Sequence, residues 1–381
     1  MKKLRIGILF GGRSGEHEVS LLSAASILKA IDRKKYEVVP IGITKEGHWV
    51  TGEAAEQLLH SQGGKAGKLA PLVKANAVVL PPIPDKRGQA RLVAFERNAE
   101  ASKVHALDVI FPVLHGTFGE DGTLQGLLDL AGVAYIGSGV LGSATGMDKD
   151  IMKRLFASAS LPITSHLTFL RTDWEKSPRK LVSQIEAALQ YPIFVKPANL
   201  GSSVGISKAH NRKELKAAMD LAASYDRKLV VEQGVGGEHG KPREFEVAVL
   251  GNDQAEASIV GEIVPGKEFY DYEDKYLSAG SVPIIPAQLT KAESKQMRAM
   301  ALAAFHSCDC SGLARVDFLR EPGADGRIFL NEINTMPGFT TISMYPKLWE
   351  ASGLSYSELI DRLIGLARER WAEQQRNRYS R

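Results

Sequence analysis

Apolar positions follow two different spacings along this chain, and the spacing separates expected strands from expected helices. Residues 4–10 (LRIGILF) form a short apolar run that ends in glycines, residues 19–31 repeat apolar positions with a helical period, and residues 36–44 form a second apolar run. Strand, helix and strand in this order are typical of a βαβ unit, which implies a parallel sheet. The same alternation returns over residues 106–137, so we expect an α/β domain that ends near residue 137.

Residues 52–105 interrupt this first domain, 1–137. They contain GGKAGK and PPIP together with scattered charges, and no apolar period persists through them. We interpret residues 52–105 as an insertion.

Two further regions follow, and we expect them to form a central domain, 138–235, and a C-terminal domain, 236–381. The last helix should begin at Ser355, because Ser355 and Glu358 have the spacing of a capping box. The other expected elements are helices at 142–159, 212–223 and 290–307, strands at 191–197, 228–235, 244–251 and 257–264, and a hairpin that begins at residue 313.

Polar side chains occupy the hairpin where a buried strand would carry apolar ones. Arg315 and Asp317 lie two residues apart on its first strand, and Glu332 and Asn334 lie two apart on its second. Side chains at this spacing share one face of a strand. A solvated sheet face is the simpler explanation for a single polar pair. If the register brings both pairs to one face, however, a cation, two carboxylates and an amide oxygen converge.

A loop of small residues gives the strongest indication of a nucleotide. Lys196 ends an apolar strand, and Gly201, Ser202, Ser203 and Gly205 follow it. Backbone N–H groups in such a loop can approach phosphate oxygens closely, although a Gly/Ser loop alone is also typical of an ordinary turn. A lone lysine at a strand end favours the phosphate interpretation, because it needs an anion. Neither GGKAGKL nor GSGVLG completes a Walker A or Rossmann fingerprint.

The first domain supplies a second group of candidates at the carboxyl edge of its sheet. Glu16 lies in GGRSGEHEVS directly after the first strand, and His115 follows another expected strand. Each could simply cap or border the core. Ligands bind at the carboxyl edge of parallel sheets, so their shared position there favours a binding site.

Composition excludes several other classes of protein. The 381 residues carry 48 basic and 44 acidic side chains, a formal net charge of +4, and no run of like charges that would indicate binding to nucleic acid or a membrane. The first apolar run is too short for a signal-peptide core, and no run is long enough to span a membrane, so we expect a soluble, cytoplasmic protein. Cys308 and Cys310 have the spacing of a metal clip, but without a second Cys/His pair nearby we expect reduced, structural thiols.

Seven segments in one order resemble the D-alanine:D-alanine ligases of the ATP-grasp superfamily. They are GGRSGEHEVS, LHGTFGEDGTLQG, GMDKD, FVKPANLGSSVG, FYDYEDKYLS, ARVDF and NEINTMPGFT, and the likeness extends over residues 11–345. The resemblance implies an α/β ATP-grasp fold with an N-terminal Rossmann-like domain, and ATP held between the central and C-terminal domains. It also implies ATP-dependent joining of two D-alanines through an acyl phosphate for peptidoglycan synthesis, two Mg²⁺ or Mn²⁺ ions, and a homodimer.

The same resemblance implies a role for individual residues. Carried over by motif, the roles are catalysis for Glu16, Ser202, Tyr276, Arg315 and Gly338; D-alanine binding for His115, Lys275, Ser343 and Met344; ATP binding for Lys149, Lys196, Ser203, Glu232, Gln233, Val235 and Glu244; and metal binding for Asp317, Glu332 and Asn334. Relatives often carry another residue at position 233, so a base contact through the Gln233 side chain is the least supported of these roles.

Three alternatives to this interpretation stay open at this point. A related ligase could use D-lactate or D-serine as its second substrate, and Tyr276 argues against D-lactate because depsipeptide-forming relatives usually differ in this loop. A nicotinamide oxidoreductase would rest on the N-terminal glycines alone. A catalytically silent nucleotide-binding regulator would be expected to lack a metal ligand or Arg315, and the sequence retains all of them.

Overall fold

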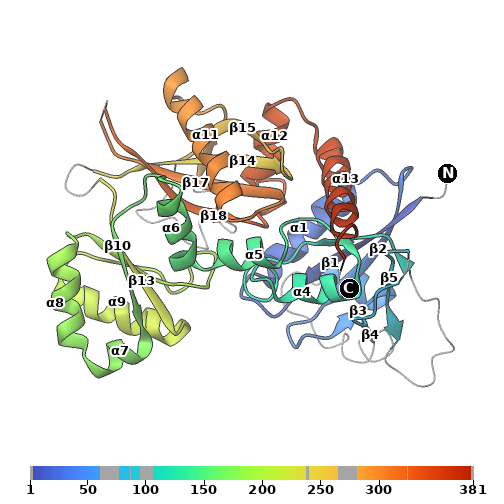
Figure 1. Ribbon diagram of the computed structural model, residues 1–381, viewed down its shortest axis with the longest axis horizontal. Helices are drawn as coiled ribbons and strands as arrows, with labels where there is room; N and C mark the ends of the chain where they lie inside the picture. Colours follow the sequence, from blue (N-terminus) through green and yellow to red (C-terminus); the bar gives the residue numbers. More distant parts are fainter. Residues whose placement is uncertain are drawn as a thin grey trace.

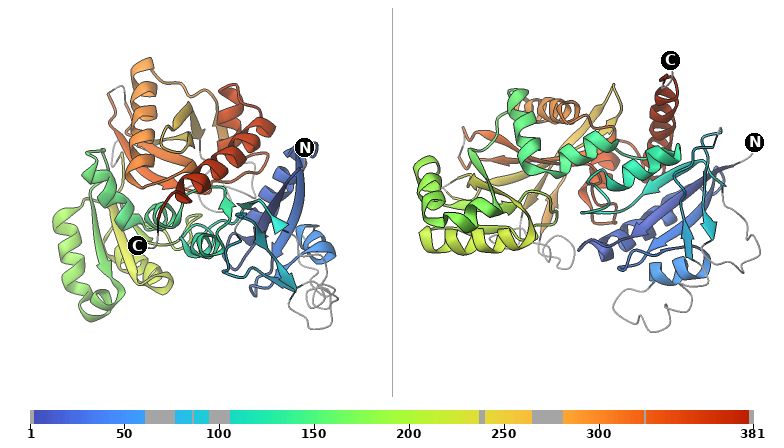
Figure 2. Two further views of the ribbon diagram at one scale, coloured as in Figure 1. Left: turned by 45° about the vertical axis from the view of Figure 1, so that its right-hand side comes forward. Right: turned by 60° about the horizontal axis from the view of Figure 1, so that its bottom comes forward.

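The computed structural model places most of the chain in three lobes, each built on its own β-sheet (Figure 1; Figure 2). Figure 1 shows the N-terminal lobe in blue and teal on the right, a green and yellow lobe on the left, and an orange lobe at the top. The structure describes residues 3–60, 77–85, 87–94, 106–236, 240–264, 281–323 and 325–378.

The N-terminal lobe contains a seven-stranded sheet in the order β6-β4-β3-β2-β1-β8-β9. Strands β2, β1, β8 and β9 are parallel, as the alternation of strand and helix predicts, whereas β3, β4 and β6 add antiparallel strands at one edge. The strands are β1 (Leu4–Gly11), β2 (Tyr36–Ile43), β3 (Trp49–Val50), β4 (Ala77–Val79), β6 (Val93–Ala94), β8 (Val109–Pro112) and β9 (Ala134–Tyr135), and a separate pair comprises β5 (Ala90–Arg91) and β7 (Ala106–Leu107).

Apolar side chains cover both faces of this sheet. Ile6, Ile8 and Phe10 point into a core shared with α1 (His17–Ala30), whereas Leu9 packs into a second core with α4 (Thr123–Ala131). A parallel sheet covered on both faces has nearly continuous apolar strands, as the run at 4–10 does. Helix α4 ends where the sequence predicts, because Gly132 adopts a left-handed conformation with φ 66°.

The described part of residues 52–105 continues the first sheet rather than leaving it. Residues Gly52–His60 form α2, whose buried face packs against β2, and β4 pairs with β3. The short strands have too few residues to show a period, so they could not be predicted from the pattern of apolar residues.

The central lobe is a four-stranded antiparallel sheet in the order β10-β13-β11-β12 with helices on one side. Its core contains Ile193, Val195 and Val231 with the apolar faces of the helices. The elements are β10 (His166–Leu170), α7 (Arg171–Lys176), α8 (Pro178–Ala188), β11 (Ile193–Pro197), β12 (Ser207–Ala209), α9 (Arg212–Tyr225) and β13 (Lys228–Gln233).

The C-terminal lobe is a five-stranded antiparallel sheet in the order β16-β15-β14-β17-β18. Helix α11 and helix α6 (Lys149–Ser158) pack on its apolar face. The elements are β14 (Arg243–Gly251), β15 (Glu256–Val264), β16 (Val282–Ile284), α11 (Lys291–Ser307), β17 (Gly312–Arg320), β18 (Ile328–Asn334), α12 (Met344–Ala351) and α13 (Tyr356–Gln374).

The single helix expected over residues 142–159 is wrong, because two helices lie there. Helix α5 (Val140–Met147) ends at Asp148, and α6 (Lys149–Ser158) begins there. The Asp148 carboxylate accepts hydrogen bonds from the N–H groups of Asp150 and Ile151, each at 3.1 Å, and this N-cap starts the second helix.

The last helix returns the chain to the N-terminal lobe. Helix α13 begins with the predicted capping box of Ser355 and Glu358. Near its end, the Arg370 guanidinium lies 4.2 Å from the ring centre of Tyr135, and the Trp371 indole N–H donates to the carbonyl oxygen of Gly132 at 2.8 Å. The first and last segments of the chain therefore share one core.

Two further expectations from the sequence concern membrane-spanning helices and the two cysteines. None of the helices in those residues is long and apolar enough to cross a membrane. Cys308 and Cys310 are both free and buried, as structural thiols would be, and burial raises the pKa of Cys308 to about 12.

Candidate active site

The hairpin register brings the two polar pairs to one face, a point that the sequence alone left open. Arg315 on β17 lies opposite Asn334 on β18, and Asp317 lies opposite Glu332. A bulge between Asp317 and Phe318 shifts the register, because Asn331 is an extra residue on β18.

The bulge explains how a core strand changes into a polar one. Before it, Ile328 and Leu330 are buried; after it, Ile333 joins the same core. The buried positions on β18 are therefore even-numbered before the bulge and odd-numbered after it. As a result, Glu332 and Asn334 turn away from the core toward a cavity.

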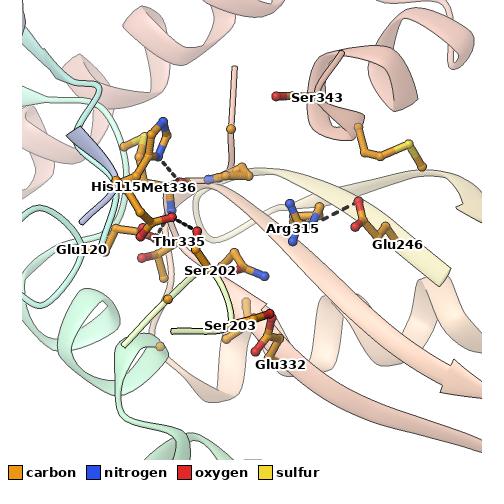
Figure 3. A pocket seen from close by; sticks show the side chains of 18 of the residues that line it. His115, Glu120, Ser202, Ser203, Glu246, Arg315, Glu332, Thr335, Met336 and Ser343 are labelled. Atoms are coloured by element: carbon orange, nitrogen blue, oxygen red, sulfur yellow. Dashed lines mark hydrogen bonds and ion pairs between the residues drawn. The ribbon is translucent and has the colours of Figure 1, made fainter. Parts of the chain in front are cut away.

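Asp317 is the centre of this polar group. The Arg315 guanidinium donates to both of its oxygens at 2.7 Å, and the Asn334 side-chain amide donates to one of them at 3.0 Å. On the other side, Arg315 Nε lies 3.1 Å from Glu246 Oε2 on β14 (Figure 3).

These side chains fit a hard cation that is shared with a phosphate. Asp317, Glu332 and Asn334 offer carboxylate and amide oxygens on two paired strands, and Mg²⁺ prefers oxygen ligands. Among the described residues no three His, Cys, Asp or Glu side chains group as a metal site. Phosphate oxygens and water would have to complete the coordination, which is usual for Mg²⁺ bound with a nucleotide.

Two cavities meet at these residues. The smaller has a volume of about 320 Å³ and extends toward the N-terminal sheet; the larger, about 600 Å³, lies between the central and C-terminal sheets. Ser203, Glu246, Arg315 and Glu332 line both. A group transferred from one cavity to the other would pass these four side chains.

Glu16 forms the inner end of the smaller cavity. It is buried at the start of α1 and accepts a hydrogen bond from the Ser202 hydroxyl, which crosses from the central lobe. Neighbouring glycines allow this approach, since a Cβ at Gly116 or Gly201 would lie 2.5 or 2.8 Å from Glu16 Oε2. The sequence-predicted residues Glu16 and Ser202 are thus in contact.

His115 connects this cavity to the loop after β18. Its Nδ1 lies 3.0 Å from the carbonyl oxygen of Met336, which only accepts, so Nδ1 carries the proton. Nε2 then accepts from the Ser23 hydroxyl at 3.0 Å, and that hydroxyl accepts from the N–H of Phe339. Burial lowers the pKa of His115, which favours this neutral form. Both ring nitrogens hold the loop, so His115 positions the site rather than offering a free donor.

Glu120 completes the inner wall, and the sequence analysis missed it. Its two oxygens accept from the N–H of Gly116 at 2.8 Å and from the N–H of Met336 at 3.1 Å. Burial and the nearby Glu16 raise its pKa to about 8. In GEDG the residue is typical of a turn, and nothing local indicates that it lies near a second carboxylate.

The loop that joins the two cavities is under backbone strain. Ser202 and Ser203 adopt φ values of 48° and 60°, in the left-handed region that side chains other than glycine and asparagine rarely enter. Lys149, at the start of α6, donates from Nζ to the carbonyl oxygen of Leu200 at 2.6 Å. The expected phosphate cover is therefore held on both sides, by Glu16 and by Lys149.

Charged groups are buried at the far end of the larger cavity. Glu232 Oε2 lies 3.0 Å from Lys196 Nζ and 3.4 Å from Lys153 Nζ, whereas Glu232 Oε1 is buried without a hydrogen-bond partner within the described ranges. Burial raises the pKa of Glu232, but the two ammonium groups outweigh it and lower the pKa to about 2. A buried anion with one unpaired oxygen fits a ligand N–H donor.

The other nucleotide candidates line this cavity, with one qualification. Glu244 and Val235 lie on its wall. Gln233 also borders it, but the Gln233 side-chain oxygen accepts from the backbone N–H of Gln190 at 3.2 Å, so this side chain is already engaged.

The loop after β18 supplies the remaining candidates. Gly338, Ser343 and Met344 all line the smaller cavity. A Cβ at Gly338 would lie 2.8 Å from Ser343 Oγ, so a larger residue here would displace the Ser343 hydroxyl. Ser343 Oγ accepts from the N–H of Thr340 at 3.0 Å.

Two of the predicted site residues, Lys275 and Tyr276, lie outside the described residues.

Lys153 and Glu246, like Glu120, lie at or next to the site and were not predicted from the sequence. Lys153 has helical spacing to Lys149 and so resembles a solvated helix face, and Glu246 lies in an apolar strand whose partner strands the sequence does not identify.

Sequence comparison identifies two family models along the chain. The D-ala D-ala ligase N-terminus matches residues 5–138, and the D-ala D-ala ligase C-terminus matches residues 155–365. Together they cover most of the chain.

Individual proteins are similar over nearly the full length. A D-alanine–D-alanine ligase of Natranaerobius thermophilus is 50% identical and covers 99% of this chain and 98% of its own. The solved D-alanine-D-alanine ligase of Coxiella burnetii has 35% identity and a TM-score of 0.80, with 99% and 97% coverage. The solved VanG D-Ala:D-Ser ligase of Enterococcus faecalis has 36% identity and the same TM-score of 0.80, with 96% and 100% coverage.

Proposed function

The chain belongs to the D-alanine–D-alanine ligase family, with its ATP-grasp fold, and we propose that its two cavities divide the family reaction between them. It is an ATP-dependent ligase that joins two D-alanines and releases ADP and phosphate, and its dipeptide serves peptidoglycan synthesis. The larger cavity takes ATP, and the smaller takes the amino acids.

A carboxylate is a poor acyl donor, so the first D-alanine must be activated. Transfer of the terminal phosphoryl of ATP to its carboxylate gives an acyl phosphate with a good leaving group, and the amine of the second D-alanine then attacks the carbonyl carbon. Bound Mg²⁺ neutralises charge on the transferring phosphoryl.

In the smaller cavity, we assign the ammonium of the first D-alanine to Glu16. The Glu16 carboxylate is buried and accepts a hydrogen bond from Ser202. The neighbouring Glu120 adds a second negative charge when it is ionised and none when it is protonated. The carboxylate of this D-alanine would then extend toward Arg315, where the two cavities meet. This places the reacting oxygen at the passage to ATP.

In the larger cavity, adenine would lie against Glu232 and the backbone from Gln233 to Val235, and the ribose against Glu244. Lys196, which lines the larger cavity, and Lys149, which lines the smaller one, would meet the phosphates beside the loop at Ser203. Asp317, Glu332 and Asn334 would hold the metal.

Arg315 is the side chain that we assign to the oxyanion of the tetrahedral intermediate. In this structure it forms a bidentate pair with Asp317. The guanidinium would face that oxyanion when the amine attacks, with the N–H of Gly338 as a second donor. Ser343 and the start of α12 would take the carboxylate of the second D-alanine.

The observation that carries this assignment is the convergence of Arg315, Asp317, Glu332 and Asn334 where the two cavities meet. The test is phosphate release from ATP with D-alanine, L-alanine, D-lactate and D-serine compared as substrates. We expect release with D-alanine to exceed the other three, with D-alanyl-D-alanine as the product. Equal release with L-alanine would contradict the substrate assignment, and a mixed product with D-serine would place the chain with the D-Ala:D-Ser ligases.

Three further features belong to the proposal. The domains are 1–137, 138–235 and 236–381; the chain forms a homodimer, which light scattering would test; and it acts in the cytoplasm, where its ATP is available.

A further inference from the structure

A buried lysine lies behind the wall of the larger cavity without lining it. Lys153, on α6, is completely buried, and its Nζ lies 3.4 Å from both Glu232 Oε2 and the Thr164 hydroxyl. Glu232 and Thr164 line the larger cavity, whereas Lys153 is not among the lining residues of either cavity. Any effect of Lys153 on a ligand must therefore pass through its neighbours.

All the partners of Glu232 gather on one of its oxygens. Lys196, Lys153 and Thr164 contact Oε2, and Oε1 is left buried without a hydrogen-bond partner in the part of the chain that the structure describes. An unpaired carboxylate oxygen in such a place costs free energy, and an N–H donor from a ligand would remove that cost.

Lys196 alone cannot keep Glu232 in this state throughout the reaction. Lys196 lines the larger cavity and, in the proposed function, moves to a phosphate group. Lys153 and Thr164 would then be the remaining contacts of Oε2. Without Lys153, the carboxylate would turn toward Lys196 or take up a proton, and either change would remove the fixed acceptor.

We propose that Lys153 is a positioning residue for base selection, which holds Glu232 so that Oε1 accepts the 6-amino group of adenine. The inference rests on the proposed ATP site. A fixed anionic acceptor favours a 6-amino purine over a purine with no substituent or an oxygen at that position, because only the amino group donates.

The test measures binding rather than turnover. ATP, purine riboside 5′-triphosphate, which lacks the 6-amino group, and inosine 5′-triphosphate are titrated calorimetrically with Mg²⁺ and without D-alanine. The wild type should prefer ATP over both analogues by about tenfold or more, the value of one hydrogen bond to a charged group. Lys153→Met should reduce this preference to about threefold or less, mainly by weakening ATP binding.

Lys228→Met is the matched control. Lys228 also pairs with two carboxylates, at 2.6 Å from the half-buried Asp148 and 3.4 Å from the buried Asp150, but it lines neither cavity. Its loss should leave the preference for ATP unchanged. Thr164→Val removes the hydroxyl between Lys153 and Glu232 with little change in volume, and it should lower the preference part of the way even if Lys153→Met does not fold.

The outcomes separate the inference from the function on which it rests. A wild-type protein that does not bind ATP would contradict the proposed function. A wild type that binds ATP, with the same preference retained in Lys153→Met or in Thr164→Val, would contradict only the role of Lys153. An equal loss of affinity for all three nucleotides would show that Lys153 serves stability alone, and this too would overturn the inference.

Discussion

Changing Glu120 to glutamine should alter how the stability of the protein depends on pH. Burial and Glu16 raise the pKa of Glu120 from 4.5 to about 8 in the folded state. A raised pKa means that the folded state keeps a proton that the unfolded state has lost. This contribution to stability is fully present below about pH 4.5 and is lost as pH rises through about 8.

The size of the effect follows from that shift. One pKa unit corresponds to about 1.4 kcal/mol, so the wild type should lose at most about 5 kcal/mol from this group between pH 4.5 and 8. Glutamine cannot ionise and removes the loss. It also has only one acceptor oxygen for the N–H groups of Gly116 and Met336, which costs about 1–2 kcal/mol at every pH. The variant should therefore be less stable than the wild type at pH 5 and more stable at pH 8.5.

Urea unfolding midpoints of the two proteins from pH 5 to 9 provide the measurement. The difference between them should change sign within this range. Glu53→Gln, on the exposed face of α2, is the control and should show a small difference that does not vary above pH 6. A constant difference between wild type and Glu120→Gln across the range would refute the assigned protonation.

Three other substitutions test the proposed roles. Glu332→Gln should lower turnover by more than about hundredfold, because even residues that only hydrogen-bond to metal ligands contribute about 10–100-fold. It should also weaken Mg²⁺-dependent ATP binding, and an unchanged magnesium dependence would contradict the metal assignment. Arg315→Met should lower kcat by about a hundredfold or more with little change in the KM for ATP; the reverse result would make Arg315 a nucleotide ligand. Gly201→Ala would place its Cβ 2.8 Å from Glu16 Oε2, so the KM for the first D-alanine should rise while ATP binding is retained; an unchanged KM would argue against Glu16.

The sequence predicted the elements whose signals are local. The capping box at Ser355 and Glu358 and the glycine stop at Gly132 lie within a few residues of the ends that they mark. The two polar pairs on the hairpin were visible in the sequence, but the register that opposes them depends on the bulge at Asn331. That bulge was not predictable, since an extra residue is defined only against the partner strand.

The break between α5 and α6 shows a limit of a different kind. Residues 142–159 keep a helical period throughout, and the Asp148 cap was present in the sequence, but a cap inside a continuous period does not show whether the helix stops there. Lys149 bonds to Leu200, and its N–H to the carbonyl of Ala198, so contacts with the central lobe decide the break.

The inner wall of the site depends on contacts that no local pattern contains. His115 and Glu120 both form hydrogen bonds with Met336, across 221 and 216 residues of sequence. Ser23 forms a hydrogen bond with Phe339 across 316 residues. All three fix the loop that carries Gly338. In the proposed function, the N-terminal lobe that would bind the first D-alanine thus also orients the loop that would stabilise its tetrahedral intermediate. Because one rigid network holds both, a small displacement of His115 or Glu120 would move the oxyanion donor relative to the substrate, and misplacements of this size are costly to rate.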